Sequence, residues 1–320
     1  MPPPALLLAG CQGPQSALAP AGPAAQAAAW LWWGMLGWFA LVWAAVLGLW
    51  LYALVRRPPD CDEARAKRLG RRWIVAGGLL LPGFSILALL VFGIPQGLRM
   101  LPLPQAGEAP LRIEVIGHQW WWEVSYPESG VVTANRLALP VGRPVDLELT
   151  SVDVIHSFWV PSLAGKLDML PGRRLTLRLV AERAGVYRGQ CAEFCGAQHA
   201  RMALSVEALA PDEFERWQAA RRVAPPVPAE HAAAVAAFRP YCGQCHRVAG
   251  ISPGGRGPDL TDVGSRPSLG AGTLAMGEGA MRRWLGEHQR LKPHNGMPRH
   301  DALPAGTLDA IAAWLESLRP

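Results

Sequence analysis

Two long stretches without a charged side chain limit what this chain can fold into. Residues 1–55 contain no Asp, Glu, Lys or Arg, and neither does the stretch from Trp73 to Leu98. An uncharged apolar run of about 20 residues can cross the hydrocarbon core of a bilayer as a helix. We therefore predict two transmembrane helices, Trp30–Val55 and Trp73–Phe92. Two buried helices of a soluble domain are the alternative, but each run is longer than a globular core requires.

The segment between these runs is basic and sets the expected orientation. Residues 56–72 hold seven Arg or Lys side chains against three acidic ones, so this loop carries +4 of the total charge of +6. Short basic loops stay on the cytoplasmic side. We expect a two-pass protein of a bacterial inner (cell) membrane, with both chain ends on the periplasmic or outer face. The remaining charge forms no basic stripe, which excludes nucleic-acid binding.

The rest of the chain changes its pattern twice. Apolar and polar residues alternate in stretches that begin at Leu111, Val145 and Leu175, and Pro or Gly residues bound each stretch. This pattern predicts a Greek-key β-sandwich or barrel. An Ala-Pro-Pro-Val-Pro run then predicts a semi-rigid extended linker. Helices are expected at Ala232–Phe238 and Thr307–Leu318, the second with an apolar face.

The predicted fold class is therefore multidomain: a two-helix transmembrane hairpin, a Greek-key β domain and an all-α domain. The predicted boundaries, in chain order, are 1–29 for a leader and flexible lead-in, 30–98 for the hairpin, 99–209 for the β domain, 210–230 for the linker and 231–320 for the last domain.

The six cysteines include one near the N-terminus with an interpretation of its own. Leu8-Ala-Gly-Cys11 resembles a bacterial lipoprotein processing site, at which the cysteine is acylated and becomes the new N-terminus. The hydrophobic stretch before it is short and contains no Lys or Arg, which departs from a standard signal. A lipid on Cys11 and a chance match in an Ala- and Leu-rich leader both stay open. Cys61 lies in the basic loop.

A second group of cysteines has the composition of a copper site. Cys191, Cys195, His199 and Met202 lie within twelve residues, and His156 precedes them. Copper that transfers electrons favours thiolate and imidazole ligands with a weak thioether. Two thiolates can each bridge two metal ions and leave one His for each, so the pattern favours a dinuclear copper centre. A disulfide would leave the His and Met residues unexplained, and zinc rarely binds Met.

The third group, Cys242-Gly-Gln-Cys245-His246, has the spacing of a c-type haem attachment site. Both thiols add to haem vinyl groups, and His246 binds the iron. A thioredoxin-like motif would need a βαβ context, and a zinc site would need another Cys pair. For the second axial ligand we predict Met297, which lies between Gly and Pro before the last helix. The alternatives are Met276, Met281, His288, His294 and His300.

These motifs resemble those of a known family. Together with Gly117-His-Gln-Trp-Trp-Trp122 and Lys166-Leu-Asp-Met-Leu-Pro-Gly-Arg173, they make residues 30–209 similar to subunit II of haem–copper cytochrome c oxidases. Residues 231–320 resemble a class I cytochrome c domain, in which the Gly257-Pro-Asp-Leu260 loop packs beneath the haem. The combination resembles the caa-type subunit II, where a cytochrome c domain is fused behind the copper domain.

The resemblance implies a cupredoxin-like β domain with a copper A centre. Its two coppers would be bridged by Cys191 and Cys195. The remaining ligands implied for copper are His156, His199, Met202 and the carbonyl oxygen of Glu193. The Glu193 carboxylate would bind a Mg or Mn ion shared with subunit I.

The resemblance also implies the function and the partners. The chain would relay electrons from an external donor through haem c to copper A, and on to subunit I for oxygen reduction coupled to proton pumping. Its partners would be subunit I, subunit III and a donor such as a cytochrome c or a quinol–cytochrome c reductase. No residue of this chain would itself be catalytic. Trp120 would receive electrons from cytochrome c, with Trp121 and Trp122 as alternatives.

One departure from the family pattern leaves a question open. The family often places a carboxylate for proton uptake near the mouth of the second helix, but no acidic residue lies between Glu63 and Glu108. Two other functions also stay open. The chain could be the electron-accepting subunit of a related haem–copper nitric oxide reductase, or a free-standing membrane redox carrier.

Overall fold

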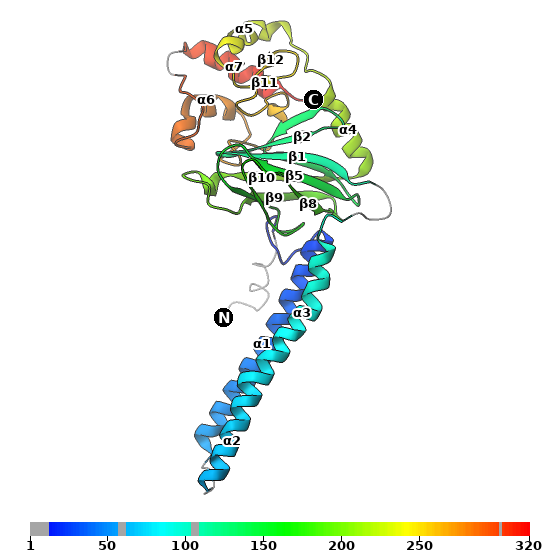
Figure 1. Ribbon diagram of the computed structural model, residues 1–320. Helices are drawn as coiled ribbons and strands as arrows, with labels where there is room; N and C mark the ends of the chain where they lie inside the picture. Colours follow the sequence, from blue (N-terminus) through cyan, green and yellow to red (C-terminus); the bar gives the residue numbers. More distant parts are fainter. Residues whose placement is uncertain (1–12, 57–61, 104–108, 301–302) are drawn as a thin grey trace, which may run out of the picture. The chain divides into compact units, whose positions relative to one another are not determined.

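The computed structural model describes residues 13–56, 62–103, 109–300 and 303–320 (Figure 1). Cys11, with its predicted lipid, and Cys61 lie outside the described residues. The chain divides into two compact units, one formed by Gln26–Leu101 and the other by the rest of the chain.

The Gln26–Leu101 unit is a helical hairpin, with the helices side by side in Figure 1. Trp38 of one helix donates a hydrogen bond to Ser85 of the other, with 2.9 Å between the indole nitrogen and the hydroxyl oxygen. Both predicted hydrophobic helices are confirmed, and the structure has two candidate membrane spans in its described part, Pro23–Val55 and Glu63–Leu98. The segments are α1 (Pro23–Val55), α2 (Glu63–Val75), the π-helix η3 (Ala76–Leu80) and α3 (Leu81–Arg99).

The second hydrophobic helix contains Pro82, and the helix changes its geometry just before this residue. The five residues Ala76–Leu80 form a π-helical segment, and Pro82 occupies the first turn of the α-helix that follows. A proline removes one backbone donor and crowds the preceding turn. The wider π-turn interrupts the α-helical ladder at this point, so the span continues through the proline.

The predicted β-sandwich is confirmed, with two five-stranded sheets in the described part of the chain. The first sheet has the order β3-β2-β1-β5-β8. Its strands are β1 (Leu111–His118), β2 (Trp121–Tyr126), β3 (Val131–Ala134), β5 (Val145–Ser151) and β8 (Leu175–Leu179). The second sheet has the order β4-β10-β9-β6-β7. Its strands are β4 (Arg136–Pro140), β6 (His156–Trp159), β7 (Leu167–Met169), β9 (Gly185–Cys191) and β10 (Ala203–Leu209).

The alternating stretches of the sequence form the centre of the sandwich. In β1 and β5 every second residue is buried, and the buried set includes Ile113, Val115, Leu147 and Leu149. The polar residues between them lie on the more exposed face, as a period of two requires. β1 pairs with β5 in parallel, and β4 pairs with β10 in parallel. β1, β2 and β3 follow one another as antiparallel neighbours, and the two parallel pairs arise because the chain then crosses between the sheets.

Two segments outside the strands cover this core. Helix α4 (Pro211–Arg222) contributes Phe214 and Trp217, whose rings lie near Tyr126 of β2. Ala21, in the stretch expected as a flexible lead-in, is also buried in the core, and its N–H donates to the Ser162 carbonyl over 2.6 Å. The β domain therefore includes residues from before the first membrane helix and from the first half of the predicted linker.

The C-terminal domain is built from three helices around a small core. The contact of Phe238 with Trp314 lies at its centre, with 4.9 Å between the ring centroids. The two predicted helices are confirmed, and a third lies between them. The helices are α5 (Ala232–Tyr241), α6 (Ala280–Leu291) and α7 (Ala305–Ser317). The short segments are η5 (Ala229–His231), η6 (Val263–Ser265), β11 (Arg247–Val248), β12 (Ser252–Pro253), β13 (Ser268–Leu269) and β14 (Leu274–Ala275).

Candidate metal and haem sites

Neighbouring strands bring the predicted copper ligands together. His156 begins β6 and Cys191 ends β9, and these strands pair side by side. Cys195 and His199 lie on the loop that leads from β9 to β10, and Met202 ends this loop. The N–H of Cys191 donates to the Met202 carbonyl over 3.0 Å, which closes the loop at its base. All five predicted side chains therefore surround one point at the edge of the second sheet.

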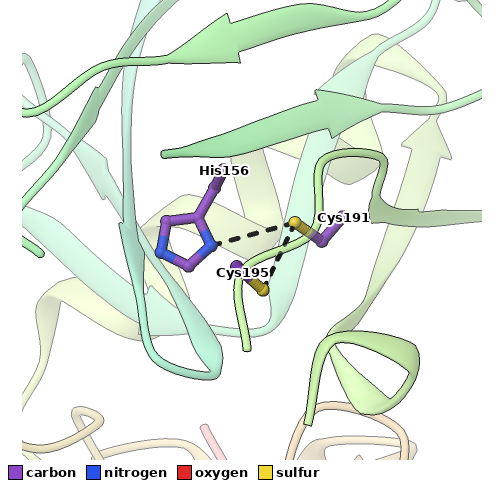
Figure 2. Close-up of side chains that lie close together, drawn as sticks. All are labelled: His156, Cys191 and Cys195. Carbon is purple, nitrogen blue, oxygen red and sulfur yellow. Dashed lines mark hydrogen bonds between the residues drawn. The ribbon is translucent and has the colours of Figure 1, made fainter. Parts of the chain in front are cut away.

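The sulfur and nitrogen atoms form a paired arrangement. The two cysteine sulfurs lie 3.8 Å apart, and each has one imidazole Nδ1 beside it: His156 at 3.8 Å from Cys191, and His199 at 3.6 Å from Cys195. Figure 2 shows one half of this pairing, in which dashed lines join the Cys191 sulfur to the His156 imidazole and to the Cys195 sulfur. The Met202 sulfur lies 3.8 Å from the Cys195 sulfur. A disulfide bond has a length of about 2.0 Å, so both thiols are free.

The electrostatics of the pair favour a bound cation. The pKa of Cys191 is lowered chiefly by its hydrogen-bond contact with the Cys195 sulfur, an effect that outweighs burial. The pKa of Cys195 is raised by the same contact with Cys191 and by burial. One sulfur of the pair therefore keeps its proton unless a positive charge compensates for the second thiolate. A soft cation between the two sulfurs meets this requirement.

Neighbouring groups orient the ligands. The Nε2 atom of His156 lies 2.8 Å from the Asp153 carboxylate, which turns Nδ1 toward Cys191. Burial lowers the pKa of His156, but hydrogen bonds to Cys191 and Asp153 outweigh burial and raise it. Glu193 has its carbonyl oxygen 3.2 Å from the Cys191 sulfur, while its side chain is exposed. The carbonyl therefore faces the site, and the carboxylate faces away from the core.

The three consecutive tryptophans have different environments. The Trp120 indole donates to the Cys195 carbonyl over 3.0 Å, and the Trp122 indole donates to the Met202 carbonyl over 3.4 Å. Trp121 instead stacks on His118, with 4.0 Å between ring centroids. Trp120 and Trp122 therefore support the ligand loop through their indole N–H groups, whereas the Trp121 ring packs on His118.

The predicted haem attachment residues follow α5. The His246 imidazole lies against Gly257, where an added Cβ would fall 2.8 Å from the ring. Nδ1 of His246 is 2.8 Å from the Pro258 carbonyl, so it carries the proton and leaves Nε2 free for a metal. Burial lowers the pKa of His246, which favours the neutral form that binds iron. The loop predicted to pack beneath the haem thus holds the proposed ligand.

The candidates for the second axial ligand lie before α6, within α6, and between α6 and α7. Met297 is half-buried, and its N–H donates to the Asn295 side chain over 3.0 Å. Met281 is part of the core. His288 is buried, with Nδ1 3.2 Å from Asn295. Met297 stays a prediction, while Met281 has a packing role.

Sequence analysis missed two residues that contact these sites. Asp153, which orients His156, stands three residues before it, and an acidic residue so close to a predicted ligand is a usable signal. Lys292 reaches the carbonyl oxygens of Trp120 and Arg201 from a distant part of the chain. No local pattern around Lys292 indicates this contact.

Comparisons with known proteins give a consistent assignment. A family described as cytochrome c oxidase subunit II, periplasmic domain, matches residues 129–209, and the cytochrome c family matches residues 232–319. Cytochrome c oxidase subunit 2 of Alkalihalophilus pseudofirmus is 32% identical over 332 residues, which cover 98% of this chain and 94% of that protein.

Two other relatives cover part of the chain. Cytochrome c oxidase subunit 2 of Bacillus sp. strain PS3 is 34% identical over 65% of this chain and 62% of its own length. Quinol oxidase subunit 2 of Bacillus cereus is 30% identical over 66% of this chain and 75% of its own length. Since the similarity to the first relative runs almost end to end and both family matches occur in order, the chain belongs to the cytochrome c oxidase subunit II family, in the caa form with a fused C-terminal cytochrome c domain, and is a subunit of an oxidoreductase.

Proposed function

We propose that this chain carries electrons from an external donor, by way of haem c, to a copper A centre and on to subunit I, where oxygen is reduced and protons are pumped. The paired arrangement of two buried sulfurs with one imidazole each supports this function most directly. Two candidate membrane helices and the cytochrome c match add to it.

The donor set fits a pair of copper ions. Cys191 and Cys195 would bridge them. His156 and His199 would complete the two halves, with Met202 and the Glu193 carbonyl as weak ligands. Bound copper supplies a one-electron carrier, and sharing the charge between two ions limits the change in bond lengths. The chain's own residues exclude water, since the two cysteines and His156 are buried.

The second carrier would be held on the C-terminal domain. Cys242 and Cys245 would form the thioether bonds, and His246 and Met297 would bind the iron. Covalently bound haem supplies a second one-electron carrier. The Pro258 carbonyl fixes the proton on Nδ1 of His246 and so presents Nε2 as a ligand.

The partners follow from the same proposal. Subunit I would lie against the copper site, where the exposed Glu193 side chain would bind a Mg or Mn ion between the subunits. Subunit III and a donor such as a cytochrome c or a quinol–cytochrome c reductase complete the assembly. Trp120, bonded to the Cys195 carbonyl, would receive electrons on the way to copper.

Metal analysis combined with optical and EPR spectra of the purified protein tests this proposal. We expect about two copper atoms per chain, bound by two bridging thiolates, and a low-spin haem c. Cys191→Ser should abolish the dicopper signal and retain the haem spectrum. Cys242→Ser is the matched control, and it should disturb haem attachment while the copper signal stays. Unchanged copper in Cys191→Ser would contradict the ligand assignment.

The two alternatives need a separate measurement. Turnover of the purified complex with oxygen and with nitric oxide distinguishes an oxidase from a nitric oxide reductase. Purification without an integral-membrane partner would favour a free-standing carrier.

A further inference from the structure

One buried lysine joins the copper domain to the cytochrome c domain. Lys292, directly after α6, is 3% exposed, and its ammonium donates to the carbonyl oxygens of Trp120 at 2.7 Å, Arg201 at 2.7 Å and Gly270 at 2.8 Å. A lysine ammonium has three donors and no acceptor, so these carbonyls satisfy it completely. The side chain is closed to solvent, and this burial lowers the pKa of Lys292 to about 7.

The two carbonyls that Lys292 binds in the copper domain belong to Trp120 and Arg201, residues that contact or form part of the ligand loop. The Trp120 indole holds the Cys195 carbonyl. Arg201 immediately precedes Met202, and its guanidinium also donates to the Leu291 carbonyl of the cytochrome domain. On the other side of Met202, the N–H of Ala203 donates to the Ala271 carbonyl over 3.0 Å. The cytochrome domain thus contacts the residues on both sides of a predicted copper ligand.

The loop Gly270–Gly272 is shaped for this close approach. Gly270, Ala271 and Gly272 all have positive φ angles, of 59°, 57° and 83°. A Cβ added to Gly272 would lie 3.0 Å from the Ala203 side chain, and one added to Gly270 would fall 2.4 Å from the Trp284 ring. Glycine adopts this conformation freely and leaves room for the neighbouring backbone. The conformation of the Gly270–Gly272 loop therefore allows its backbone to lie directly against Ala203 of the copper domain.

We propose that Lys292 is a positioning residue for intramolecular electron transfer, because it clamps the cytochrome c domain onto the loop that carries Cys195 and Met202. The haem domain then donates electrons from a docked position and not from a free tether. This inference rests on the proposed function. Two hydrogen bonds link Lys292 to the ligand loop through Trp120: the lysine donates to the Trp120 carbonyl, and the Trp120 indole donates to the Cys195 carbonyl.

The test compares Lys292→Met with Arg283→Met in the full chain loaded with haem and copper. Arg283 is an exposed cation of α6 that forms an ion pair with the partly exposed Glu287, so this control removes the same charge. The first readout is hydrogen exchange of the Ala203 amide, which is protected only while the domains are docked. The second is the rate of haem-to-copper electron transfer after flash reduction of the haem.

In Lys292→Met we expect Ala203 exchange to accelerate and electron transfer to slow by about tenfold or more, which corresponds to about 1.4 kcal/mol per tenfold change in docking. Haem and copper spectra, reduction potentials and the rate of haem reduction by an external donor should stay unchanged. Arg283→Met should match the wild type in both readouts.

If Lys292→Met shows wild-type rates of Ala203 amide exchange and of haem-to-copper electron transfer, the proposed role of Lys292 is wrong. If this variant loses its haem, Lys292→Gln tests the same three contacts with an uncharged polar side chain, and wild-type Ala203 exchange in that variant would overturn the inference. Failure of the proposed function looks different: the wild type itself would show no haem-to-copper transfer, while the exchange experiment would still report on the clamp.

Discussion

A buried carboxylate, Asp262, provides the sharpest stability prediction. Asp262 is 2% exposed and lies between two guanidinium groups, with Arg266 at 2.6 Å and Arg221 at 3.0 Å. Its oxygen also accepts a hydrogen bond from Thr133 of β3 over 3.2 Å. These partners come from the copper domain, from α4 and from the cytochrome c domain, so one carboxylate joins three parts of the chain.

Replacing Asp262 with Asn removes the negative charge but keeps the shape. Two buried guanidiniums then lose the carboxylate that pairs with both of them, and breaking a buried pair in this way costs about 3–5 kcal/mol. Denaturant unfolding of the purified protein measures the change. The control is Asp309→Asn, whose exposed ion pair with Arg282 is worth about 0–1 kcal/mol. Equal losses of stability in the two variants would refute the argument from buried charge.

The same carboxylate predicts a dependence on pH. Burial opposes its charge, but Arg266 and Arg221 outweigh burial and lower the pKa of Asp262 to about 2. Because the pKa in the folded state is below that in the unfolded state, the stabilisation is complete above about pH 4 and is lost as the pH falls toward 2. The shift corresponds to about 2 kcal/mol. Asp262→Asn should therefore remove this part of the acid sensitivity, and an unchanged pH profile would contradict the assignment.

Two further predictions concern the metal sites. Gly257→Ala should push the His246 imidazole and alter the haem spectrum, because the added methyl group would lie 2.8 Å from the ring; Gly255→Ala, with open space around it, should leave the spectrum unchanged. Asp153→Asn should lower copper affinity about 10- to 100-fold in a chelator competition, since it weakens the orientation of His156; an unchanged affinity would argue against this role.

Local patterns in the sequence were sufficient for most of the fold, and the residues that they predicted as copper ligands lie close together in the structure. The alternation from Leu111 predicted β1, and the short spacing of Cys191 and Cys195 predicted two neighbouring sulfurs, which lie 3.8 Å apart. Such signals work because a strand or a short loop is determined by adjacent residues. The π-helical segment before Pro82 has no comparable signal, because helical turns of different width have similar composition.

Contacts between distant segments could not be predicted in this way. The Pro-rich run 224–228 indicated a linker between two domains, but the composition of a linker does not show how the domains that it joins contact each other. Thr133 meets Asp262, and Trp120 meets Lys292, across more than one hundred residues in each case. Each contact depends on how two finished domains fit together, which composition and spacing do not encode.

The Asp262 carboxylate and the Lys292 ammonium each bind groups of both domains, so the two domains must match each other at this interface. A cytochrome c domain transplanted from another oxidase would bury the carbonyls of Trp120 and Arg201 without a donor unless it brought an equivalent of Lys292. It would likewise leave the Arg221 guanidinium without this ion pair unless it brought an equivalent of Asp262. Gene fusion alone therefore joins two domains without matching their interface. In a working chimaera, the residues on both sides of each interdomain contact would have to be exchanged together.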